Sequence, residues 1–347
     1  MAKPSLIKPP RILKGATFGV FTPSTPAHVM FREKYLHGLS VLRSLGYQVK
    51  EGELTAQAKT QGYRAGSPKE RAEELMKLIL DPKVHGIIST IGGENSSSLI
   101  PYLDFDAIRA HPKVICGYSD VTALHLAILR HAGLSTFYGP AVVPSFGEWP
   151  TVLSETLESF QDAVSGLAPS VRSLHPPKRW SNHFRDAASD AWKVEPRNFE
   201  DNPGWRALRS GQATAPLIAA NLNTLISSAG TPSFPDLEGK ILLIEEMFAP
   251  MGRLERNLRQ LQRMGVFDVI AGLVVGKPEV FQSAGAPFTY EELVLEIVGD
   301  QRTFPIITEF DCGHTHPMLT LSQGVHVTIE AKQAFETRFT AEESMVE

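Results

Sequence analysis

In the first half of the chain, short apolar runs typical of strands alternate with segments whose apolar residues recur at helical spacing. Short strand-like runs occupy residues 16–23, 47–52, 84–90, 113–116 and 134–139. Helical segments are indicated at residues 30–46, 67–80, near 96–103 and from Ser119 onward. Strands that alternate with helices form mostly parallel sheets with helices on both faces, so this half predicts a doubly wound α/β sheet. In such sheets, sites gather beyond the carboxyl ends of the strands.

One helix start is unusually well marked. Ser67 is placed as an N-cap, Pro68 follows at the first helical position, and Glu70 can close a capping box with Ser67. The sequence therefore predicts a helix over residues 67–80.

The pattern weakens in the middle of the chain and then resumes. Residues 148–166 look helical, but 173–205 are rich in Pro, Asn, Asp and Trp without periodicity, which is typical of a linker or lid. Alternating strands and helices return at residues 240–246, 253–265, 269–278, 289–299 and 304–308, and residues 324–330 and 334–339 predict a closing antiparallel hairpin. We expect an N-terminal domain at 1–165, a linker and lid at 166–210, and a C-terminal α/β domain with antiparallel strands at 211–347.

Composition and charge narrow the function classes. A chain of 347 residues favours two domains, and 42% hydrophobic with 21% charged residues is ordinary for a globular protein. A net charge of -4 offers no basic surface for a nucleic acid polymer, and no apolar run is long enough to span a membrane. Two cysteines cannot build a disulfide framework or a four-cysteine zinc site, so we expect a reducing, cytoplasmic setting.

Gly117-Tyr118-Ser119 stands between a predicted strand and a predicted helix. This is the form of a nucleophile elbow, in which a tight turn lifts a serine hydroxyl out of the sheet. Val121 occupies the place of the second glycine of the GxSxG pattern. Pattern alone also fits a serine that merely caps the helix, so both interpretations stay open.

Backbone donors for a developing oxyanion are available near this serine. The N–H of Asp120 lies at the start of the helix, and Gly92-Gly93 at a neighbouring strand end would let amides approach a ligand closely. The chain lacks the GxGxxG and GxxxxGK[ST] fingerprints, so a phosphate-binding loop is the weaker interpretation.

A nucleophilic serine needs a general base, and the base needs a group that orients it. Candidates for both stand at other predicted strand ends. His314 and His316 follow the strand at 304–308, and Glu245-Glu246 close an apolar strand, where an imidazolium would be a suitable partner. The alternatives are a metal site for the histidine pair, for which further ligands are not evident, and helix-capping or solvated glutamates. We therefore expect no metal and no cofactor.

Three motifs in order, GYSD, LLIEE and DCGHTHPMLTL, resemble those of the serine LD-carboxypeptidase and microcin C immunity family, peptidase family S66. The likeness extends to GATFGVFTPSTP, TIGGENSSSLIPYLDFD and GLVVGKPE, and covers nearly the whole chain. The resemblance implies Ser119 as nucleophile, His314 as general base and Glu245 as the acidic member. It also implies a Rossmann-like N-terminal domain bearing the serine, a C-terminal domain bringing Glu and His, and a homodimer.

The resemblance implies a serine peptidase that cleaves an amide bond in a small peptide conjugate. The form of the GGENSSS, NPGW and GHTxPMLTL segments is closer to the immunity-type branch, which cleaves peptidyl or aminoacyl nucleotides. The alternative is release of D-alanine from L,D-muropeptides during wall recycling, and a third is a cleft-binding protein without chemistry. Predicted substrate contacts are Glu94, Asn95, Asn221 and a lid tryptophan, Trp192, with Trp180 as the other candidate or either one as a core anchor.

Overall fold

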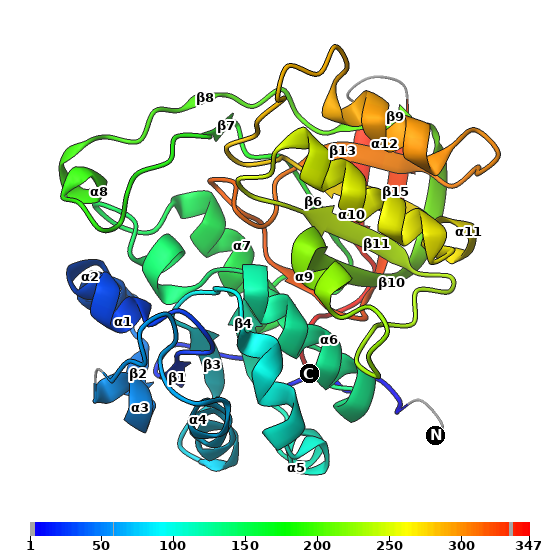
Figure 1. The fold of residues 1–347 in the computed structure, drawn as a ribbon. Helices are drawn as coiled ribbons and strands as arrows, with labels where there is room; N and C mark the ends of the chain where they lie inside the picture. The colour runs from blue at the N-terminus through cyan, green and yellow to red at the C-terminus, as the bar shows by residue number, and fades with distance from the viewer. Residues whose placement is uncertain (1–3, 58, 333–335) are drawn as a thin grey trace.

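The first half of the chain folds into a six-stranded sheet with strand order β14-β5-β4-β3-β1-β2 (Figure 1). This computed structural model describes residues 4–57, 59–332 and 336–347. The strands are β1 (Thr17–Phe21), β2 (Gln48–Glu51), β3 (Gly86–Ser89), β4 (Val114–Gly117), β5 (Phe137–Tyr138) and β14 (Leu321–Ser322). All neighbouring pairs are parallel except β5 with β14.

Helices cover both faces of this sheet, which confirms the doubly wound arrangement. They are α1 (Ala27–Met30), α2 (Arg32–Ser44), α3 (Glu53–Ala56), α4 (Pro68–Leu80), η1 (Ser96–Tyr102), α5 (Phe105–Ala110), η2 (Ser119–Val121), α6 (Thr122–Ala132), η3 (Val142–Phe146) and α7 (Ser154–Ser165). One core cluster joins α2 and α7 to the sheet through Leu39 and Phe160, and another joins α4 and α6 through Leu75 and Ile128. The capping box of α4 is present as predicted.

The second half forms an eight-stranded sheet with order β6-β16-β15-β10-β11-β12-β13-β9. Its strands are β6 (Arg172–Leu174), β9 (Arg206–Arg209), β10 (Gly211–Asn221), β11 (Ile241–Glu245), β12 (Gly272–Gly276), β13 (Ile306–Phe310), β15 (His326–Ala331) and β16 (Thr337–Ala341). Strands β10 to β13 are parallel, and the outer pairs are antiparallel. The hairpin of β15 and β16 confirms the predicted antiparallel ending; residues 334 and 335 of the expected strand lie outside the described residues.

Helices pack on one face of this second sheet. They are α9 (Leu222–Ser227), α10 (Met251–Arg263), α11 (Val266–Val269) and α12 (Tyr290–Val298). Their core contains Leu258 and Leu293 against the sheet, whereas on the other face a second cluster joins Leu243 and Phe339 to side chains of the first half, such as Tyr138. Among the described residues, no helix has the length and apolarity needed to cross a membrane.

The segment between the two halves, residues 172–209, runs as an arch from the second sheet to the first helices (Figure 1), and we call it the arch. It carries the short antiparallel pair β7 (Arg179–Trp180) and β8 (Glu200–Asp201), and the helical turn α8 (Ala191–Val194). The Lys193 ammonium pairs with the Glu33 carboxylate of α2 at 2.7 Å. The arch is thereby fastened to α2, at the side of the molecule where the parallel strands of the first sheet end.

Candidate active site

Ser119 lies on a sharp turn directly after β4. Tyr118 is extended, Ser119 has a φ of 62°, and the chain then enters η2 and α6. A left-handed conformation costs a residue with a side chain about 1–3 kcal/mol, and such outliers cluster at functional sites. A Cβ at Gly117 would lie 2.5 Å from the Ser89 Oγ, so the turn needs glycine there. This geometry is that of a strained elbow that presents a hydroxyl.

The predicted oxyanion donors surround this serine. A Cβ at Gly92 would lie 2.9 Å from the Ser119 Cβ and 3.1 Å from the backbone N of Asp120, so the two strand ends are in direct contact. The Asp120 carboxylate accepts hydrogen bonds from the backbone N–H groups of Asn95 and Ser96, both at 2.9 Å. The side chain of Asp120 therefore fixes the Gly-Gly loop against the elbow.

His314 and Glu245 form a short, buried pair. The His314 Nδ1 lies 2.7 Å from the Glu245 Oε2, and the His314 backbone N–H also donates to that oxygen at 3.3 Å. Gly313 has a φ of 79°, and a Cβ there would lie 2.2 Å from the same oxygen. Only glycine lets the histidine loop close over the end of β11 in this way.

The ionisation of the pair follows from its surroundings. Burial has the largest single effect and lowers the pKa of the His314 imidazole, but Glu245, with smaller contributions from Glu279 and Glu246, raises that pKa above its ordinary value. Burial opposes ionisation of Glu245, yet its pKa is lowered by His314 and by hydrogen bonds from Tyr138 and Asn221. With Glu245 ionised, the proton of a neutral His314 resides on Nδ1, and Nε2 is left to accept one.

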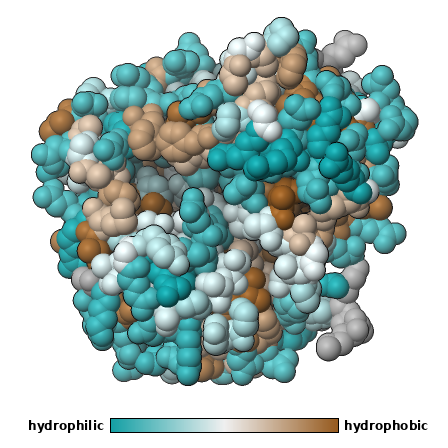
Figure 2. All heavy atoms as spheres, viewed as in Figure 1, coloured by the Kyte–Doolittle hydropathy of each residue, from teal (hydrophilic) through white to brown (hydrophobic). Residues whose placement is uncertain are grey.

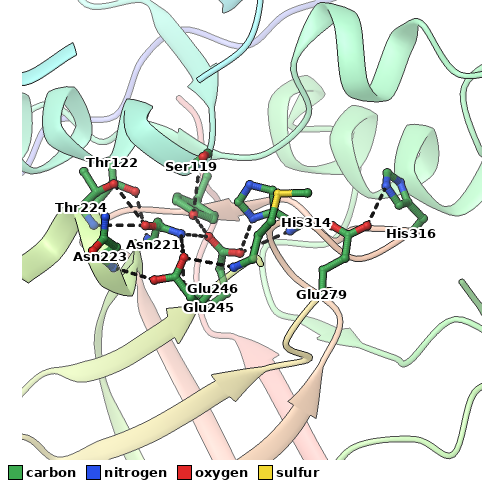
Figure 3. Close-up of polar contacts among 12 residues, drawn as sticks. Ser119, Thr122, Asn221, Asn223, Thr224, Glu245, Glu246, Glu279, His314 and His316 are labelled. Atoms are coloured by element: carbon green, nitrogen blue, oxygen red, sulfur yellow. Dashed lines mark hydrogen bonds and ion pairs between the residues drawn. The ribbon is translucent and has the colours of Figure 1, made fainter. Parts of the chain in front are cut away.

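Tyr138 links the serine to the glutamate. Its hydroxyl donates to the Glu245 Oε1 at 2.6 Å and accepts from the Ser119 backbone N–H at 3.2 Å. The Asn221 amide donates to the same Glu245 oxygen at 3.1 Å. Figure 3 shows Glu245 between Asn221 and His314, with Glu279 and His316 farther along. Sequence reasoning missed Tyr138, because a tyrosine in a short strand carries no motif.

A cavity of about 560 Å³ opens over these groups, with Ser119 and His314 both in its wall. In Figure 2 the surface is hollowed between the segment carrying β7 and β8 and the helices of the first half. Gly92, Gly93, Glu94 and Asn95 line the cavity as well. The two strand ends, the histidine loop and the arch therefore enclose one space.

Two of the predicted substrate contacts lie elsewhere. Asn221 is buried and its side-chain amide donates a hydrogen bond to Glu245, so its role is to position that carboxylate. Trp192 is 4% exposed and packs its ring against Trp149 and His37, and within the described part of the chain it does not line the cavity. This placement favours the core-anchor interpretation of Trp192.

Phe184 is a large aromatic side chain that the arch presents to the cavity. It is 49% exposed, lines the wall, and lies edge-on to the Phe248 ring with centroids 5.0 Å apart. A large exposed aromatic at a cavity rim is a suitable platform for a flat ligand group. The aperiodic sequence around it gave no signal that would single it out.

A second carboxylate, Glu279, lies in the cavity wall beside the histidines. It is buried, with its Oε1 3.6 Å from the His316 Nε2. Burial raises the pKa of Glu279 to about 7, against the opposing effects of His314 and Arg197. Its charge also contributes to the raised pKa of His314. Burial first, and then Arg197 and Lys34, hold the pKa of His316 well below its usual value, so His316 is neutral.

Glu279→Gln is expected to move the acid limb of the pH–rate profile to lower pH. Removing this negative charge lowers the pKa of His314, so the neutral, proton-accepting imidazole persists into more acidic solution. Profiles of kcat/KM from about pH 5 to 9 check this. Asp186→Asn, at an exposed carboxylate in the same cavity wall, is the matched control, and an acid limb of Glu279→Gln shared with wild type would contradict the prediction.

Two family models match the chain. The LD-carboxypeptidase N-terminal domain matches residues 18–139, and the LD-carboxypeptidase C-terminal domain matches residues 214–329. The chain belongs to peptidase family S66. Both matches fall on the segments that carry Ser119, Glu245 and His314, as the order of the sequence motifs indicated. The family consists of carboxypeptidase-like hydrolases, so this member is an enzyme of that class.

The S66 relatives include both expected branches. The microcin C7 self-immunity protein MccF of Escherichia coli is 38% identical over 317 residues, 91% of each chain. A probable murein peptide carboxypeptidase of Bacillus subtilis is 29% identical, covering 95% of this chain and 92% of that protein. The solved structure of MccF in complex with aspartyl sulfamoyl adenosine has a TM-score of 0.91 at 36% identity, over 98% of this chain and all of that chain.

Proposed function

We propose that this S66 peptidase hydrolyses the amide bond of a small aminoacyl or peptidyl nucleotide, using Ser119, His314 and Glu245. The observation that carries the proposal is the 2.7 Å contact of His314 Nδ1 with Glu245, which leaves Nε2 to act as the base in a cavity that His314 and Ser119 both line. This is the order of roles in a serine hydrolase triad, with the serine on one sheet and its partners on the other.

The reaction follows from these positions. His314 takes the proton of the Ser119 hydroxyl as the oxygen attacks the carbonyl carbon, and Glu245 stabilises the imidazolium. The N–H of Asp120 and an amide of Gly92 or Gly93 hold the negative oxygen. The imidazolium then protonates the leaving nitrogen as the carbon–nitrogen bond breaks, and water, activated by His314, releases the acyl group and restores the serine.

The relatives support a nucleotide conjugate as substrate. MccF, 36% identical over nearly the whole chain, has been solved with aspartyl sulfamoyl adenosine and with glutamyl sulfamoyl guanosine. In this chain, Phe184 supplies an exposed aromatic surface for a nucleobase, in the role for which the sequence suggested Trp192 or Trp180. Glu94 and Asn95 line the same cavity and stay predicted substrate contacts.

The second candidate substrate is an L,D-muropeptide. The murein peptide carboxypeptidase relative of Bacillus subtilis supports it, and the same triad would release terminal D-alanine. Both cysteines, Cys116 and Cys312, are buried and unpaired, which suits the cytoplasmic setting proposed for either reaction. The homodimer implied by the family resemblance stays a prediction.

Mass spectrometry of the purified protein distinguishes the candidates. Wild type is incubated separately with aspartyl sulfamoyl adenosine and with an L,D-tetrapeptide muropeptide, each beside Ser119→Ala. We expect release of aspartate and sulfamoyl adenosine by wild type alone. Loss of D-alanine instead would establish the muropeptide reaction, and two unaltered substrates after long incubation would favour a binding protein without chemistry.

A further inference from the structure

Arg71 is a buried cation that the proposed reaction does not use. It comes from α4, its side chain is completely buried, and within the described part of the chain it does not line the cavity. Among the described residues, no carboxylate forms an ion pair with its guanidinium. A buried charge without a counter-ion is costly, so the oxygen atoms around this side chain must satisfy its N–H groups.

Three segments of the first half supply those oxygen atoms. The Arg71 Nε donates to the Gly66 carbonyl at 2.9 Å, and Nη1 donates to the Pro23 carbonyl, which follows β1. Nη1 also donates to the Asn95 Oδ1 at 2.7 Å, and Nη2 donates to the Ser98 Oγ at 3.0 Å. The rigid fork of a guanidinium serves acceptors in several directions at once, which an ammonium group does not do in the same geometry. One side chain therefore joins the loops after β1 and β3 to the start of α4.

The loop after β3 is held from its other side by the elbow. The Asn95 backbone N–H donates to the Asp120 carboxylate at 2.9 Å, and its side-chain oxygen accepts from Arg71. The Asp120 carboxylate also acts electrostatically on the guanidinium across this loop. Asn95 is thus fixed between a cation from α4 and an anion that follows Ser119 directly.

The segment after β1 closes the remaining side of the loop. The Thr25 backbone N–H donates to the Gly92 carbonyl at 3.2 Å, and the Ser24 Oγ accepts from the backbone N–H of Glu94 at 3.0 Å. A Cβ at Gly93 would collide with the same Ser24 oxygen. Because Arg71 also binds the Pro23 carbonyl, it holds this segment and the Gly-Gly loop together.

The place of the Gly-Gly loop matters for the reaction. Donors in an oxyanion hole act when they lie about 2.7–3.1 Å from the developing oxyanion. A misplacement of about 1 Å in such a site can cost about 100-fold in rate. Gly92 already lies so close to the elbow that a Cβ there would be 2.9 Å from the Ser119 Cβ. A small shift of this loop would therefore change the distance of its amides from the reacting carbonyl.

We propose that Arg71 is a positioning residue for the oxyanion donors, and that it acts through Asn95 and Ser98 to hold the Gly92–Asn95 loop against Ser119. The inference rests on the proposed function, because it concerns the donors of the same reaction. The donors bind the transition state more strongly than the ground state, so loss of their alignment lowers kcat more than it weakens substrate binding.

Glu74 offers a matched control on the same helix. It lies one turn farther along α4, is also buried, and accepts from the backbone N–H groups of Thr22 at 3.2 Å and Thr55 at 2.7 Å. Among the described residues, no hydrogen bond joins its side chain to the Gly92–Asn95 loop. Glu74→Gln therefore disturbs the same buried edge of the sheet without removing a contact to the proposed donors.

The test compares Arg71→Lys, Ser98→Ala and Glu74→Gln with wild type. Steady-state kinetics give kcat and KM on the conjugate that wild type hydrolyses, and calorimetry in the Ser119→Ala background gives the affinity for aspartyl sulfamoyl adenosine. Hydrogen exchange of the backbone amides of residues 91–99, followed by mass spectrometry, reports the order of the loop without turnover. Melting curves establish that each variant folds. Ser98→Ala, which removes one acceptor and keeps the arginine, carries the test if Arg71→Lys does not fold.

We expect Arg71→Lys to lower kcat by about 100-fold, while KM and ligand affinity stay within about fivefold of the parent. Exchange in residues 91–99 should become about tenfold faster or more, since the loop loses its anchor. Ser98→Ala should act in the same direction by about fivefold. Glu74→Gln should lower the melting temperature and leave kcat within about threefold of wild type.

A folded Arg71→Lys that keeps the wild-type kcat and loop exchange overturns the inference. If that variant does not fold, a Ser98→Ala indistinguishable from wild type has the same meaning. Equal losses of kcat in Arg71→Lys and Glu74→Gln also overturn it, because they would show a general structural defect. If wild type hydrolyses neither conjugate, the proposed function fails, whereas the exchange of residues 91–99 still decides whether Arg71 holds the loop.

Discussion

Ser119→Ala is expected to lower kcat/KM by about 1000-fold or more on whichever conjugate the wild type hydrolyses. The substitution removes the nucleophilic oxygen and leaves the Tyr138 contact of the backbone N–H in place. Substrate binding should survive, because the cavity wall is otherwise unchanged. Steady-state kinetics with a parallel binding measurement check the separation of turnover from affinity.

Ser119→Gly is the companion variant, because the strain at this position gives a second readout. Ser119 has a φ of 62°, which glycine adopts readily and alanine does not. Both variants should be inactive, while Ser119→Gly should melt at a higher temperature than Ser119→Ala. Retention of a tenth of wild-type turnover by either one would remove Ser119 from the mechanism.

Glu245→Gln is expected to lower kcat by about 10³–10⁴-fold, the size seen when the acidic member of a triad becomes an amide. The amide nitrogen can face Nδ1 and favour the wrong tautomer, so Nε2 would carry a proton that it should accept. Loss of the carboxylate also lowers the pKa of His314, since Glu245 contributes most to raising it. The acid limb of the residual activity should therefore lie at lower pH, which a pH–rate profile measures.

Glu246→Gln is the matched control, since it changes the next residue in the same way. Glu246 is also buried, but its oxygens accept from the backbone of Asn223 and Met247, and burial raises its pKa. It is expected to cost far less activity. Equal losses in the two variants would indicate a structural defect at the end of β11 and would argue against the role of Glu245.

The sequence predicted elements where local signals are strong. The capping residues of α4 and the alternating pattern of β15 and β16 are readable without tertiary information, and both predictions are confirmed. The longest strand, β10, was not predicted, because Gly211–Asn221 is composed largely of Ala, Gly, Pro and Asn residues, which are depleted in strands. It is held instead by pairing on both sides, with β11 and β15.

The site shows the same division. Ser119, Glu245 and His314 could be predicted because each stands in a motif at a strand end, and the structure brings Glu245 and His314 into contact. Tyr138 could not, since its place beside the elbow depends on the pairing of β5 with β4. Phe184 likewise gives no signal in the sequence until the fold brings it to the cavity wall. The hydrophobic periodicity of a sequence does not show which distant segments come into contact.

The domain limits at residues 165 and 210 stay predictions, because the strands of the two sheets do not divide at these residues. Residues 321–322, well inside the second half, form β14 and pair with β5 of the first sheet. Segments of the arch, in turn, supply β6 and β9 to the second sheet. A boundary drawn at one residue of the sequence therefore cannot separate the two sheets.

Strand β14, which lies in the second half of the sequence but pairs in the first sheet, also determines how the enzyme can open. The loop carrying His314 is held at one end by β13 in the second sheet and at the other by β14 in the first. A hinge motion that separated the two sheets would therefore move His314 away from both Ser119 and Glu245. We expect the sheets to behave as one rigid block, so that substrate enters and products leave by displacement of the arch alone.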